Sequence, residues 1–526
     1  MNEPHSPTAR TGTRFERGLA VLGELSGTRG AAVVDTPADI APDPRRFLVE
    51  WAYADILGRR GLDRHHALLP VREHRKADRR ESSTDQGKQL AMTSDVAADF
   101  GAFGEEFFRN PHPVYAELRA RGPVHRVRVP EGAEGWLVVG YGACKDALTD
   151  PTLSKNWQHA SPGLPLARLS AGHNLLSSDP PDHTRLRGLV SREFTPRRVE
   201  TLTPRVEALT GELLDTMLSS PDGRADLVEA LAFPLAIGII CELLGVPSLD
   251  RGSFRTWAEQ ALSSPDRDTR RAATGAMTAY LVGMIDEKRG RPGDDLLSAL
   301  IRSTDEDGDR LSADELIGMA WLLLVTGFET TVNLIASGVL ALLRHPDQLA
   351  SLRADLGLID NAVEEMLRYE TPVETTTYRF TTGSVTIGGV TVPGGGELVL
   401  IALADAGRDA ARFPDPNRFD IRRAAGGNLS FGHGIHYCLG APLARLQAAT
   451  AITALLERCP DLALDSDPAF LPWRQGLLIR GPRRLYVRWT DGTPKGSRAE
   501  VDPAIPVDAQ APEGVEPRVG RPDGHR

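Results

Sequence analysis

A cysteine bracketed by glycines is the residue of this sequence whose surroundings most favour chemistry. Cys438 lies in Phe431-Gly-His-Gly-Ile-His-Tyr-Cys-Leu-Gly440, directly before a helical pattern that carries Pro442 in its first turn. The positive end of a helix and its free N–H groups favour a thiolate, which is the form that binds a soft metal centre. Gly440 leaves room for a flat cofactor close to the backbone.

Three other interpretations of this loop stay open on the residues alone. Most single cysteines are buried and act as small hydrophobic side chains. A zinc site made of His433, His436 and Cys438 is a second interpretation, although it lacks a clear fourth ligand and a common zinc spacing. A nucleophilic Cys–His enzyme is the third. The flanking glycines favour a cofactor over all three.

A second polar feature interrupts a long apolar helix. Ser312-Ala-Asp-Glu315 has the form of a capping box, and apolar residues continue to Leu343, before His345-Pro346. Within this stretch, Val325-Thr-Gly-Phe-Glu-Thr-Thr331 places a carboxylate and hydroxyl groups that are costly to bury without partners. Such a break indicates a functional site or a kink. The alternative is a threonine bonded to a helix carbonyl, with Glu329 reaching solvent.

The elements that must position these residues are mainly helical. The helix that starts after Ser312 spans about 32 residues, roughly 48 Å, and its apolar middle implies burial. A shorter helix is expected from Asn361 to Tyr369, with Asp360 as its cap. Residues 384–392 predict a β-hairpin with a Gly-Gly turn, and residues 397–403 predict a strand. We therefore expect a mainly α fold with a small β portion.

Length, charge and cysteine content exclude several classes of protein. The chain has 526 residues and a formal net charge of −10, which argues against nucleic-acid binding. Its 4 cysteines form no disulfide scaffold, and the N-terminus shows no signal-peptide pattern. The apolar run from Ala230 to Cys241 is too short to cross a bilayer. We expect a cytoplasmic protein that does not enter a membrane.

Composition divides the chain into four segments. Residues 1–70 carry helical patterning of their own, and residues 71–91 form a charged linker. Residues 92–489 form the large domain. Residues 490–526 are rich in Pro, Gly and charge, and are expected to be a disordered tail.

The loop around Cys438 resembles the cysteine loop of the cytochrome P450 haem-thiolate monooxygenases, F-G-x-G-x-x-x-C-x-G, with every fixed position filled. The resemblance implies that Cys438 is the haem-iron ligand, with Phe431 packed beside the sulfur and Gly440 close to the haem. The apolar helix resembles the oxygen-binding helix of that family, (A/G)-G-x-(D/E)-T-T. It implies that Glu329 and Thr330 relay protons to dioxygen. Thr326 departs from the family, which has Ala or Gly there.

Other segments extend the resemblance over about residues 99–489. Glu365-Met-Leu-Arg368 matches the E-x-x-R motif, a clamp behind the haem, with Arg418 as the implied third member. Asp179-Pro-Pro-Asp-His-Thr-Arg-Leu-Arg187 matches D-P-P-x-H-x-x-x-R. The resemblance implies four contacts to the haem propionates: His183 and Arg187 of this segment, Arg379, eleven residues after Arg368, and His436, two residues before Cys438.

The resemblance implies a cytochrome P450 fold, with the long helix over haem b, and a monooxygenase that hydroxylates or epoxidises a small apolar substrate with O2. Ferredoxin and an NAD(P)H-dependent ferredoxin reductase would supply electrons to a monomer, and a polyketide or related secondary metabolite would be the substrate. Alternatives are a peroxide-driven peroxygenase of the same fold and a non-catalytic haem-binding protein. By position, five residues are expected to line the substrate pocket: Leu322, Val325, Thr326, Thr375 and Leu477.

Residues 14–69 carry a separate resemblance. Arg14-Phe-Glu-Arg-Gly-Leu, Ala38-Asp-Ile-Ala-Pro and Gly61-Leu-Asp63 are similar to the start of the carboxymuconolactone decarboxylase family. The match stops before the helices that would complete a core and a catalytic pocket. We therefore interpret the segment as a truncated helical extension without decarboxylase activity.

Overall fold

A computed structural model describes residues 96–490, apart from residues 167–171, 193, 248–250, 264–265 and 307–310. The predictions for the decarboxylase-like extension, the linker and the tail beyond Thr490 lie outside the described residues. The described residues up to Trp489 form one compact unit. The α-helices have these bounds: α4 Glu105–Arg109, α5 His112–Arg121, α6 Tyr141–Thr149, α7 Asp182–Ser191, α8 Pro196–Thr201, α9 Thr203–Leu218, α10 Phe233–Leu244, α11 Arg251–Ser263, α12 Arg267–Gly290, α13 Leu296–Glu306, α14 Ala313–Arg344, α15 Pro346–Ala354, α16 Ile359–Tyr369, α17 Leu403–Ala406 and α18 Ala441–Arg458.

The strands are short and form three sheets. Their bounds are β1 Ala98–Asp99, β2 Val124–Arg128, β3 Glu134–Val138, β4 Leu153–Ser154, β5 Arg224–Asp226, β6 Arg379–Thr381, β7 Val385–Ile387, β8 Val390–Val392, β9 Leu398–Ile401, β10 Ala463–Leu464 and β11 Tyr486–Arg488. The largest sheet has the order β1-β2-β3-β9-β6-β4, in which β1 pairs parallel to β2 and β3 parallel to β9. The others are β10-β11-β5 and the hairpin β7-β8. The mainly α fold with a small β portion is confirmed.

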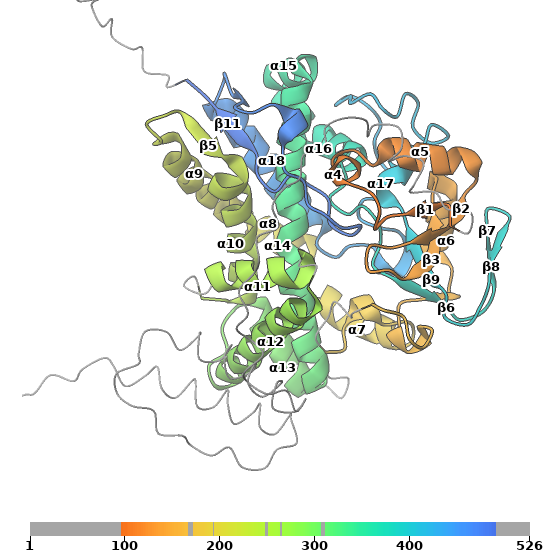
Figure 1. Ribbon diagram of the computed structural model, residues 1–526. Helices are drawn as coiled ribbons and strands as arrows, with labels where there is room; N and C mark the ends of the chain where they lie inside the picture. Colours follow the sequence, from red (N-terminus) through yellow and green to blue (C-terminus); the bar gives the residue numbers. More distant parts are fainter. Residues whose placement is uncertain are drawn as a thin grey trace, which may run out of the picture. The chain divides into compact units, whose positions relative to one another are not determined.

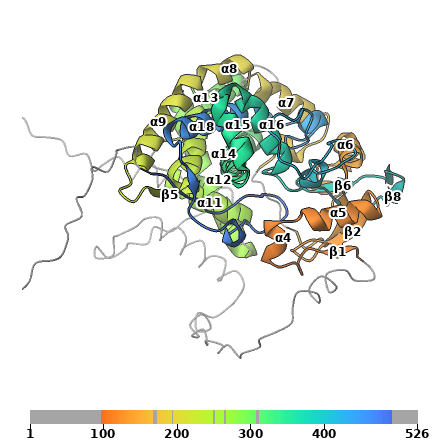
Figure 2. The ribbon, with the colours of Figure 1, turned by 90° about the horizontal axis from the view of Figure 1, so that it is seen from above.

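Helix α14 organises the helical part of the domain (Figure 1). Its N-terminus is the predicted capping box: the Ser312 N–H donates to Glu315 Oε2 at 2.7 Å, and the Glu315 N–H donates to Ser312 Oγ at 3.2 Å. Helices α10, α12, α16 and α18 pack against it, and the view from above shows it surrounded by helices, with the large sheet to one side (Figure 2). The helix is long and apolar enough to cross a membrane, but 83% of its most apolar window is buried, as in a core helix.

One glycine sets how closely two of these helices approach. A Cβ at Gly327 would lie 2.6 Å from Ile240 Cδ1 of α10, a distance that no real side chain could keep. Gly327 therefore belongs to the contact between α14 and α10, which explains why a residue with poor helix propensity lies in the middle of this helix.

Two sequence predictions need correction at their ends. Helix α16 begins at Ile359 rather than Asn361, and Asp360 lies inside it and does not cap it, because a preceding 3-10 turn (Leu356–Leu358) runs directly into the helix. Strand β9 ends at Ile401, and Leu403 begins the short helix α17. The predicted hairpin over residues 384–392 is confirmed as β7-β8.

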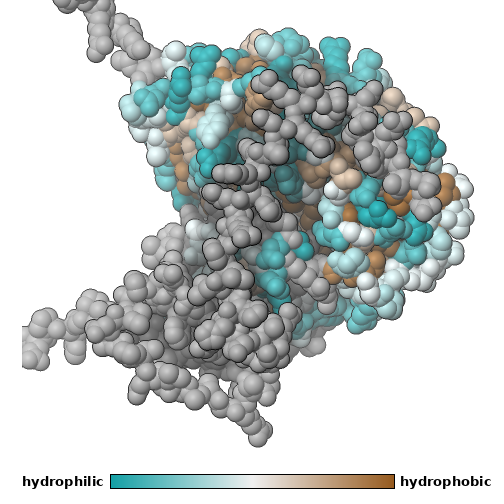
Figure 3. Space-filling model, in the orientation of Figure 1, coloured by the Kyte–Doolittle hydropathy of each residue, from teal (hydrophilic) through white to brown (hydrophobic). Residues whose placement is uncertain are grey.

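Exposed hydrophobic side chains are few in the described part of the chain. On the face drawn in Figure 3, hydrophilic side chains mingle with scattered hydrophobic ones. Few large hydrophobic side chains are exposed among the described residues: Ile435, Tyr437, Phe470 and Tyr486. Two of these lie in the loop that carries Cys438.

Candidate active site

The loop that carries Cys438 is held by its own backbone and by a close neighbour. The Cys438 N–H donates to the Phe431 carbonyl at 2.9 Å, around the 3-10 turn η8 (Gly434–His436). Gly434 has a φ of +73°, and a Cβ there would lie 2.9 Å from Thr149 Cγ2 of α6. Only glycine fits this position without strain. The loop ends at Gly440, the N-cap of α18, so the thiol lies beside the start of that helix.

The protein groups around Cys438 act on its thiol in two directions. Desolvation by the surrounding protein raises the pKa of the thiol, while the Gly440 and Ala441 amides and the Arg187 and Arg445 guanidiniums lower it. The start of α18 therefore acts in favour of the thiolate, in the direction that the sequence predicts. Phe431 packs beneath Arg445, whose Cζ lies 4.5 Å from the ring centre.

A zinc site at this loop does not fit the structure. Among the described residues, no group of three or more His, Cys, Asp or Glu side chains converges as metal ligands would. The His436 ring lies instead against the His183 ring of α7, with 4.4 Å between their centres. The interpretation based on His433, His436 and Cys438 therefore loses its geometric basis.

A cluster of cationic and imidazole side chains surrounds His436. Burial, followed by the charges of Lys155 and Arg379, lowers the pKa of His436 to about 2, and His183 and Arg187 act in the same direction. Burial also lowers the pKa of Arg379 to about 10. Three elements, α7, β6 and η8, thus bring together the four residues that the sequence assigned to a cofactor's anionic groups.

Several donors in this cluster have no acceptor among the described residues. Arg379 donates through Nη1 to the Leu153 carbonyl at 3.1 Å and through Nη2 to the Leu148 carbonyl at 3.2 Å. The Arg379 Nε, the His183 Nε2 and the His436 Nδ1 are buried and have no partner within the described chain. Buried polar groups are nearly always satisfied, and an imidazole can present an N–H through either ring nitrogen, so these atoms together with the positive charges of Arg187 and Arg379 fit an anionic ligand such as a pair of carboxylates.

The polar residues in the middle of α14 make two kinds of contact. The threonines bond to carbonyls of the helix itself, and Glu329 contacts an arginine from another part of the chain. The Thr326 hydroxyl donates to the Leu322 carbonyl at 2.7 Å, and the Thr330 hydroxyl donates to the Thr326 carbonyl at 3.1 Å. Glu329 is 5% exposed, and its Oε1 lies 2.7 Å from Arg474 Nη2. The bonding of Thr330 to a helix carbonyl matches the structural alternative raised by the sequence. Glu329, however, is buried in an ion pair and does not reach bulk solvent.

Glu329 and Thr326 line different hollows along α14. Glu329 and Arg474 lie at a hollow of about 340 Å³ that also includes Val332 and the surface residues Arg483 and Arg484. Thr326 lies one turn earlier in the helix, at a separate cavity. The Glu329 carboxylate therefore does not line the cavity that Thr326 lines. The two residues are connected only through α14, which carries both.

The second cavity, of about 150 Å³, contains most of the residues predicted to contact substrate. Val325, Thr326, Thr375 and Leu477 line it, whereas Leu322 does not. Trp321, which precedes Val325 by four residues and so lies on the same face of α14, lines the cavity instead. The lining is mostly apolar, with Trp157, Leu400 and Ile479 among its other walls, and Lys155 and Asn174 add polar groups.

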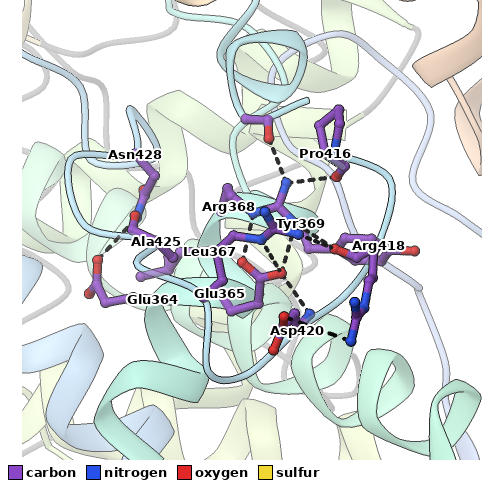
Figure 4. A network of polar contacts seen from close by, with 12 residues as sticks. Glu364, Glu365, Leu367, Arg368, Tyr369, Pro416, Arg418, Asp420, Ala425 and Asn428 are labelled. Atoms are coloured by element: carbon purple, nitrogen blue, oxygen red, sulfur yellow. Dashed lines mark hydrogen bonds and ion pairs between the residues drawn. The ribbon is translucent and has the colours of Figure 1, made fainter. Parts of the chain in front are cut away.

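A buried ion-pair network joins α16 to the loop that follows α17 (Figure 4). Glu365 and Arg368, on successive turns of α16, form a two-pronged pair with Nε–Oε2 and Nη2–Oε1 distances of 2.6 and 2.8 Å. Both side chains are fully buried. The remaining Arg368 donors reach the carbonyls of Gly407, Pro416 and Arg418.

The third side chain of this network is not the one that the sequence indicated. The Arg418 side chain is 65% exposed, and only its backbone carbonyl accepts a hydrogen bond from Arg368. Arg423 instead places its Nε 3.2 Å from Glu365 Oε1. The loop that follows α17 folds back so that Arg423 points inward and Arg418 outward, which corrects the prediction.

Comparison with known proteins identifies the fold and the family. The Cytochrome P450 family model matches residues 260–484. The chain is 56% identical over 411 residues to cytochrome P450 monooxygenase PikC of Streptomyces venezuelae, covering 78% of this chain and 99% of PikC. It is 46% identical to 6-deoxyerythronolide B hydroxylase of Saccharopolyspora erythraea, with 76% and 99% coverage. The chain belongs to the cytochrome P450 family.

A solved P450 structure superposes on this P450 over nearly the whole length of the solved protein. The tirandamycin C-bound P450 monooxygenase TamI superposes with a TM-score of 0.69 at 43% sequence identity, covering 74% of this chain and 99% of TamI. This P450 is therefore an enzyme of the monooxygenase class, with the cytochrome P450 fold. The cofactor of the family is haem b, held through a cysteine thiolate.

The residues present fit that cofactor. Haem b carries two carboxylates, and the donors of His183, Arg379 and His436 are the unsatisfied groups that two carboxylates would satisfy. Gly440 lies beside the sulfur, because a Cβ at this position would come into contact with Cys438 Sγ at 3.9 Å. When bound, the haem supplies the activation of dioxygen.

Three residues of this site escaped sequence analysis. Lys155 is buried, its ammonium donates to the carbonyls of Thr377 and Tyr378, and it lies near His436. Arg474 and Arg423 reach carboxylates that are distant in the sequence. No local spacing links these arginines to their partners, because the C-terminal loops bring them together only in the folded protein.

Proposed function

We propose that this P450 is a monooxygenase that hydroxylates or epoxidises a secondary metabolite of the polyketide type, with O2 as oxidant. The observation that carries this proposal is the 56% identity to PikC over 99% of that enzyme, together with an intact cysteine loop. 6-Deoxyerythronolide B hydroxylase, mycinamicin IV hydroxylase/epoxidase and the polyketide biosynthesis cytochrome P450 PksS are further relatives. The reaction would insert one oxygen atom into the substrate and release the other as water.

In this proposal the cysteine loop and the cationic cluster hold the cofactor from two directions. Cys438 is the iron ligand, and the amides of Gly440 and Ala441 stabilise its thiolate. His183, Arg187, Arg379 and His436 bind the two propionates. Glu365, Arg368 and Arg423 brace the segment between α17 and the cysteine loop.

Glu329 and Thr330 have the chemistry required of a proton relay. A threonine hydroxyl donates and accepts a proton without changing its net charge, and a carboxylate connects it to solvent. Thr330 is held in α14 by its bond to the Thr326 carbonyl, and Glu329 by Arg474. Each side chain must leave its present partner to deliver a proton, so delivery requires both side chains to rotate.

The electron donor is proposed to be a ferredoxin, reduced by an NAD(P)H-dependent reductase. Ile435 and Tyr437 are 50% and 38% exposed on the loop of Cys438, and Arg445 lies beside them, 3.5 Å from the Tyr437 hydroxyl. Exposed apolar side chains beside a positive charge suit a small acidic protein. We further propose a cytoplasmic monomer with a domain of residues 92–489, to which the decarboxylase-like extension, the linker and the tail add no activity.

Reconstitution tests the proposal and its alternatives. Reduced holoenzyme under carbon monoxide should show the absorption band of a thiolate-ligated haem, and its absence would refute the assignment of Cys438. Turnover with ferredoxin, reductase and NADPH should exceed turnover with hydrogen peroxide alone, whereas the reverse would indicate a peroxygenase. A non-catalytic haem protein would show the band but no spin shift with any member of a polyketide library.

A further inference from the structure

A buried carboxyl lies directly behind one wall of the cavity beside α14. Thr375 and Thr376, in the segment between α16 and β6, both line this cavity. Glu374, the residue before them, is not among the lining residues and is 1% exposed. A carboxyl is costly to bury, and such an exception beside a ligand cavity indicates a functional position.

Backbone hydrogen bonds join Glu374 to the C-terminal loop that forms another part of the same wall. The Glu374 N–H donates to the Leu478 carbonyl, and the Thr375 N–H to the Leu477 carbonyl, each at 2.9 Å. The Thr375 hydroxyl donates to the Leu477 carbonyl as well, at 2.8 Å. On its other side, the Glu374 carbonyl accepts the Ala404 N–H at 3.0 Å. Because Thr375, Leu477 and Leu478 all line the cavity, a shift of Glu374 moves the cavity wall.

The Glu374 side chain contacts two other parts of the chain. Its Oε1 accepts the hydroxyl of Tyr115, on α5, at 2.7 Å. Its Oε2 lies 3.8 Å from Arg480 Nη1, which is an ion-pair distance but too long for a hydrogen bond. Arg480 directly follows Ile479, which lines the cavity. The carboxyl therefore connects α5 to the loop that forms part of the cavity wall.

Two of the groups packed around this carboxyl have a pKa raised toward neutrality. Burial raises the pKa of Glu374 to about 7, against Arg480 and Tyr115, and that of Asp405 to about 6. Burial also raises the pKa of Tyr115 well above its ordinary value and lowers that of His112 well below its own, so both stay neutral between pH 6 and 8. The charged and titratable groups of this set come from four elements: His112, Tyr115 and Arg119 of α5, Arg368 and Glu370 at the end of α16, Asp405 and Arg408 in and after α17, and Arg480 of the C-terminal loop.

We infer that Glu374 is a positioning residue through which pH controls the ligand cavity, with the neutral carboxyl favouring ligand binding and the carboxylate opposing it. The inference rests on the proposed function, because it takes this cavity to be the substrate site. It adds control of substrate binding by a group that does not touch the substrate.

Two physical effects act in this direction. The separation of 3.8 Å between Oε2 and Arg480 suits a neutral carboxyl. A negative charge on Oε2 attracts the Arg480 guanidinium and repels the Glu370 carboxylate, which shifts the two hydrogen-bonded segments of the wall from this arrangement. A ligand that fills the cavity also replaces water next to Thr375, and this loss of water disfavours a charge on the neighbouring carboxyl. By linkage, a protein whose Glu374 is already neutral binds the ligand more tightly.

A ligand titration of the full-length holoenzyme between pH 6 and 8 tests this inference. Cyclododecanone has no titratable group, and its dissociation constant is read from the haem spin shift. In the wild-type protein this constant should rise about fivefold from pH 6 to pH 8, because binding raises the pKa of Glu374 further. Glu374→Gln is neutral at every pH and should keep the wild-type value of pH 6, within about twofold, across the range.

Two further variants distinguish this role from a purely structural one. Tyr115→Phe keeps the ring but removes the hydroxyl whose hydrogen bond lowers the pKa of Glu374, so the change in affinity should move to higher pH. Glu397→Gln makes the same substitution at a carboxylate that accepts from Trp136 Nε1 at 2.9 Å and does not line the cavity. It should keep the wild-type pH profile.

The contrary outcomes are defined by the same titration. A wild-type dissociation constant that stays constant with pH overturns the inference. A Glu374→Gln protein that keeps the wild-type profile also overturns it, because a structural role alone weakens binding equally at every pH. If Glu374→Gln does not load haem, Tyr115→Phe decides by the pH at which its affinity changes.

The probe and the proposed function have separate checks. If cyclododecanone gives no spin shift, fluconazole, whose triazoles stay neutral in this range, replaces it and is read from the displacement of the Soret band. Failure of the proposed function is recognised independently of pH, by a missing carbon monoxide band or by the absence of turnover with the ferredoxin system.

Discussion

The Glu329 carboxylate lies 2.7 Å from the Arg474 guanidinium, at a hollow separate from the one that Thr326 lines. Asn333 completes this arrangement: its Nδ2 donates to the Glu329 carbonyl at 2.8 Å, and its Oδ1 accepts from Arg474 Nε at 3.3 Å. The C-terminal loop thus fixes the carboxylate of α14. Arg474 is a positioning residue through which the loop controls Glu329.

Removing Arg474 should cost the buried Glu329 carboxylate its ion pair with this guanidinium. We expect Arg474→Met to lower the free energy of unfolding by about 3 kcal/mol, because this pair offsets part of the desolvation cost of Glu329. The double variant Arg474→Met/Glu329→Gln should recover part of this loss. Chemical denaturation of the four proteins in this cycle, followed by tryptophan fluorescence, gives the coupling energy. Additive effects would show that the two side chains do not stabilise each other.

Thr330→Ala should uncouple electron consumption from product formation. Without the hydroxyl, protons reach dioxygen by an uncontrolled route, so NADPH consumption continues while most electrons appear as hydrogen peroxide. We expect product per NADPH to fall about tenfold, which is below the range of about 10²- to 10⁴-fold attributed to a general acid because other proton routes persist. Thr330→Ser keeps the hydroxyl and should retain most of the coupling. Equal coupling in Thr330→Ala and the wild-type protein would remove Thr330 from the proposed relay.

Short sequence patterns predicted those parts of this fold that depend on interactions between residues close together in the chain. The capping box at Ser312 and the Gly-Gly hairpin over residues 384–392 are set by interactions within a few residues, and both were predicted correctly. Leu322 and Trp321 are adjacent and both apolar, so only the packing around α14 decides which one lines the cavity. Whether Arg418 or Arg423 reaches Glu365 depends on how the loop after α17 folds back, and the spacing of the residues in the sequence does not predict this.

The arginines of this loop offer a direct test of the buried network. Arg423→Ala should lower the free energy of unfolding by about 1 to 3 kcal/mol and reduce the haem-loaded fraction, because Glu365 loses a charged hydrogen bond. Arg418→Ala should change both quantities little, because the Arg418 carbonyl is retained and its side chain makes only a long, largely exposed ion pair with Asp420, at 4.0 Å. Glu365→Ala and Arg368→Ala should give little haem-loaded protein. The ratio of Soret to protein absorbance measures loading, and the opposite ranking of Arg418 and Arg423 would contradict the network.

The N-terminal segment can be tested by deletion. A chain that begins at Met92 should retain the haem content and turnover of the full-length protein, because every residue assigned to the cofactor or the cavity lies within residues 92–489. Haem content is measured by the pyridine haemochrome method, and turnover with the ferredoxin system. A clear loss of either quantity would assign residues 1–91 a role in this P450.

A buried carboxyl should give this P450 a measurable pH dependence of stability. The Tyr115 hydroxyl donates to Glu374 Oε1 at 2.7 Å, and burial raises the pKa of Glu374 to about 7, against the opposing charge of Arg480. Between about pH 4.5 and 7 the folded protein holds a proton that the unfolded chain has lost. This contribution to stability is complete below about pH 4.5 and is lost as the pH rises through 7.

The isosteric variant Glu374→Gln cannot lose that proton and provides the reference. From about pH 5 to about pH 8 the free energy of unfolding of the wild-type protein should fall relative to Glu374→Gln by about 2 to 3 kcal/mol. Burial also raises the pKa of Asp405, to about 6, but this group is common to both proteins and its effect cancels in the difference. Denaturation curves at several pH values across this range measure the difference. A difference that stays constant with pH would show that Glu374 ionises as it does in the unfolded chain.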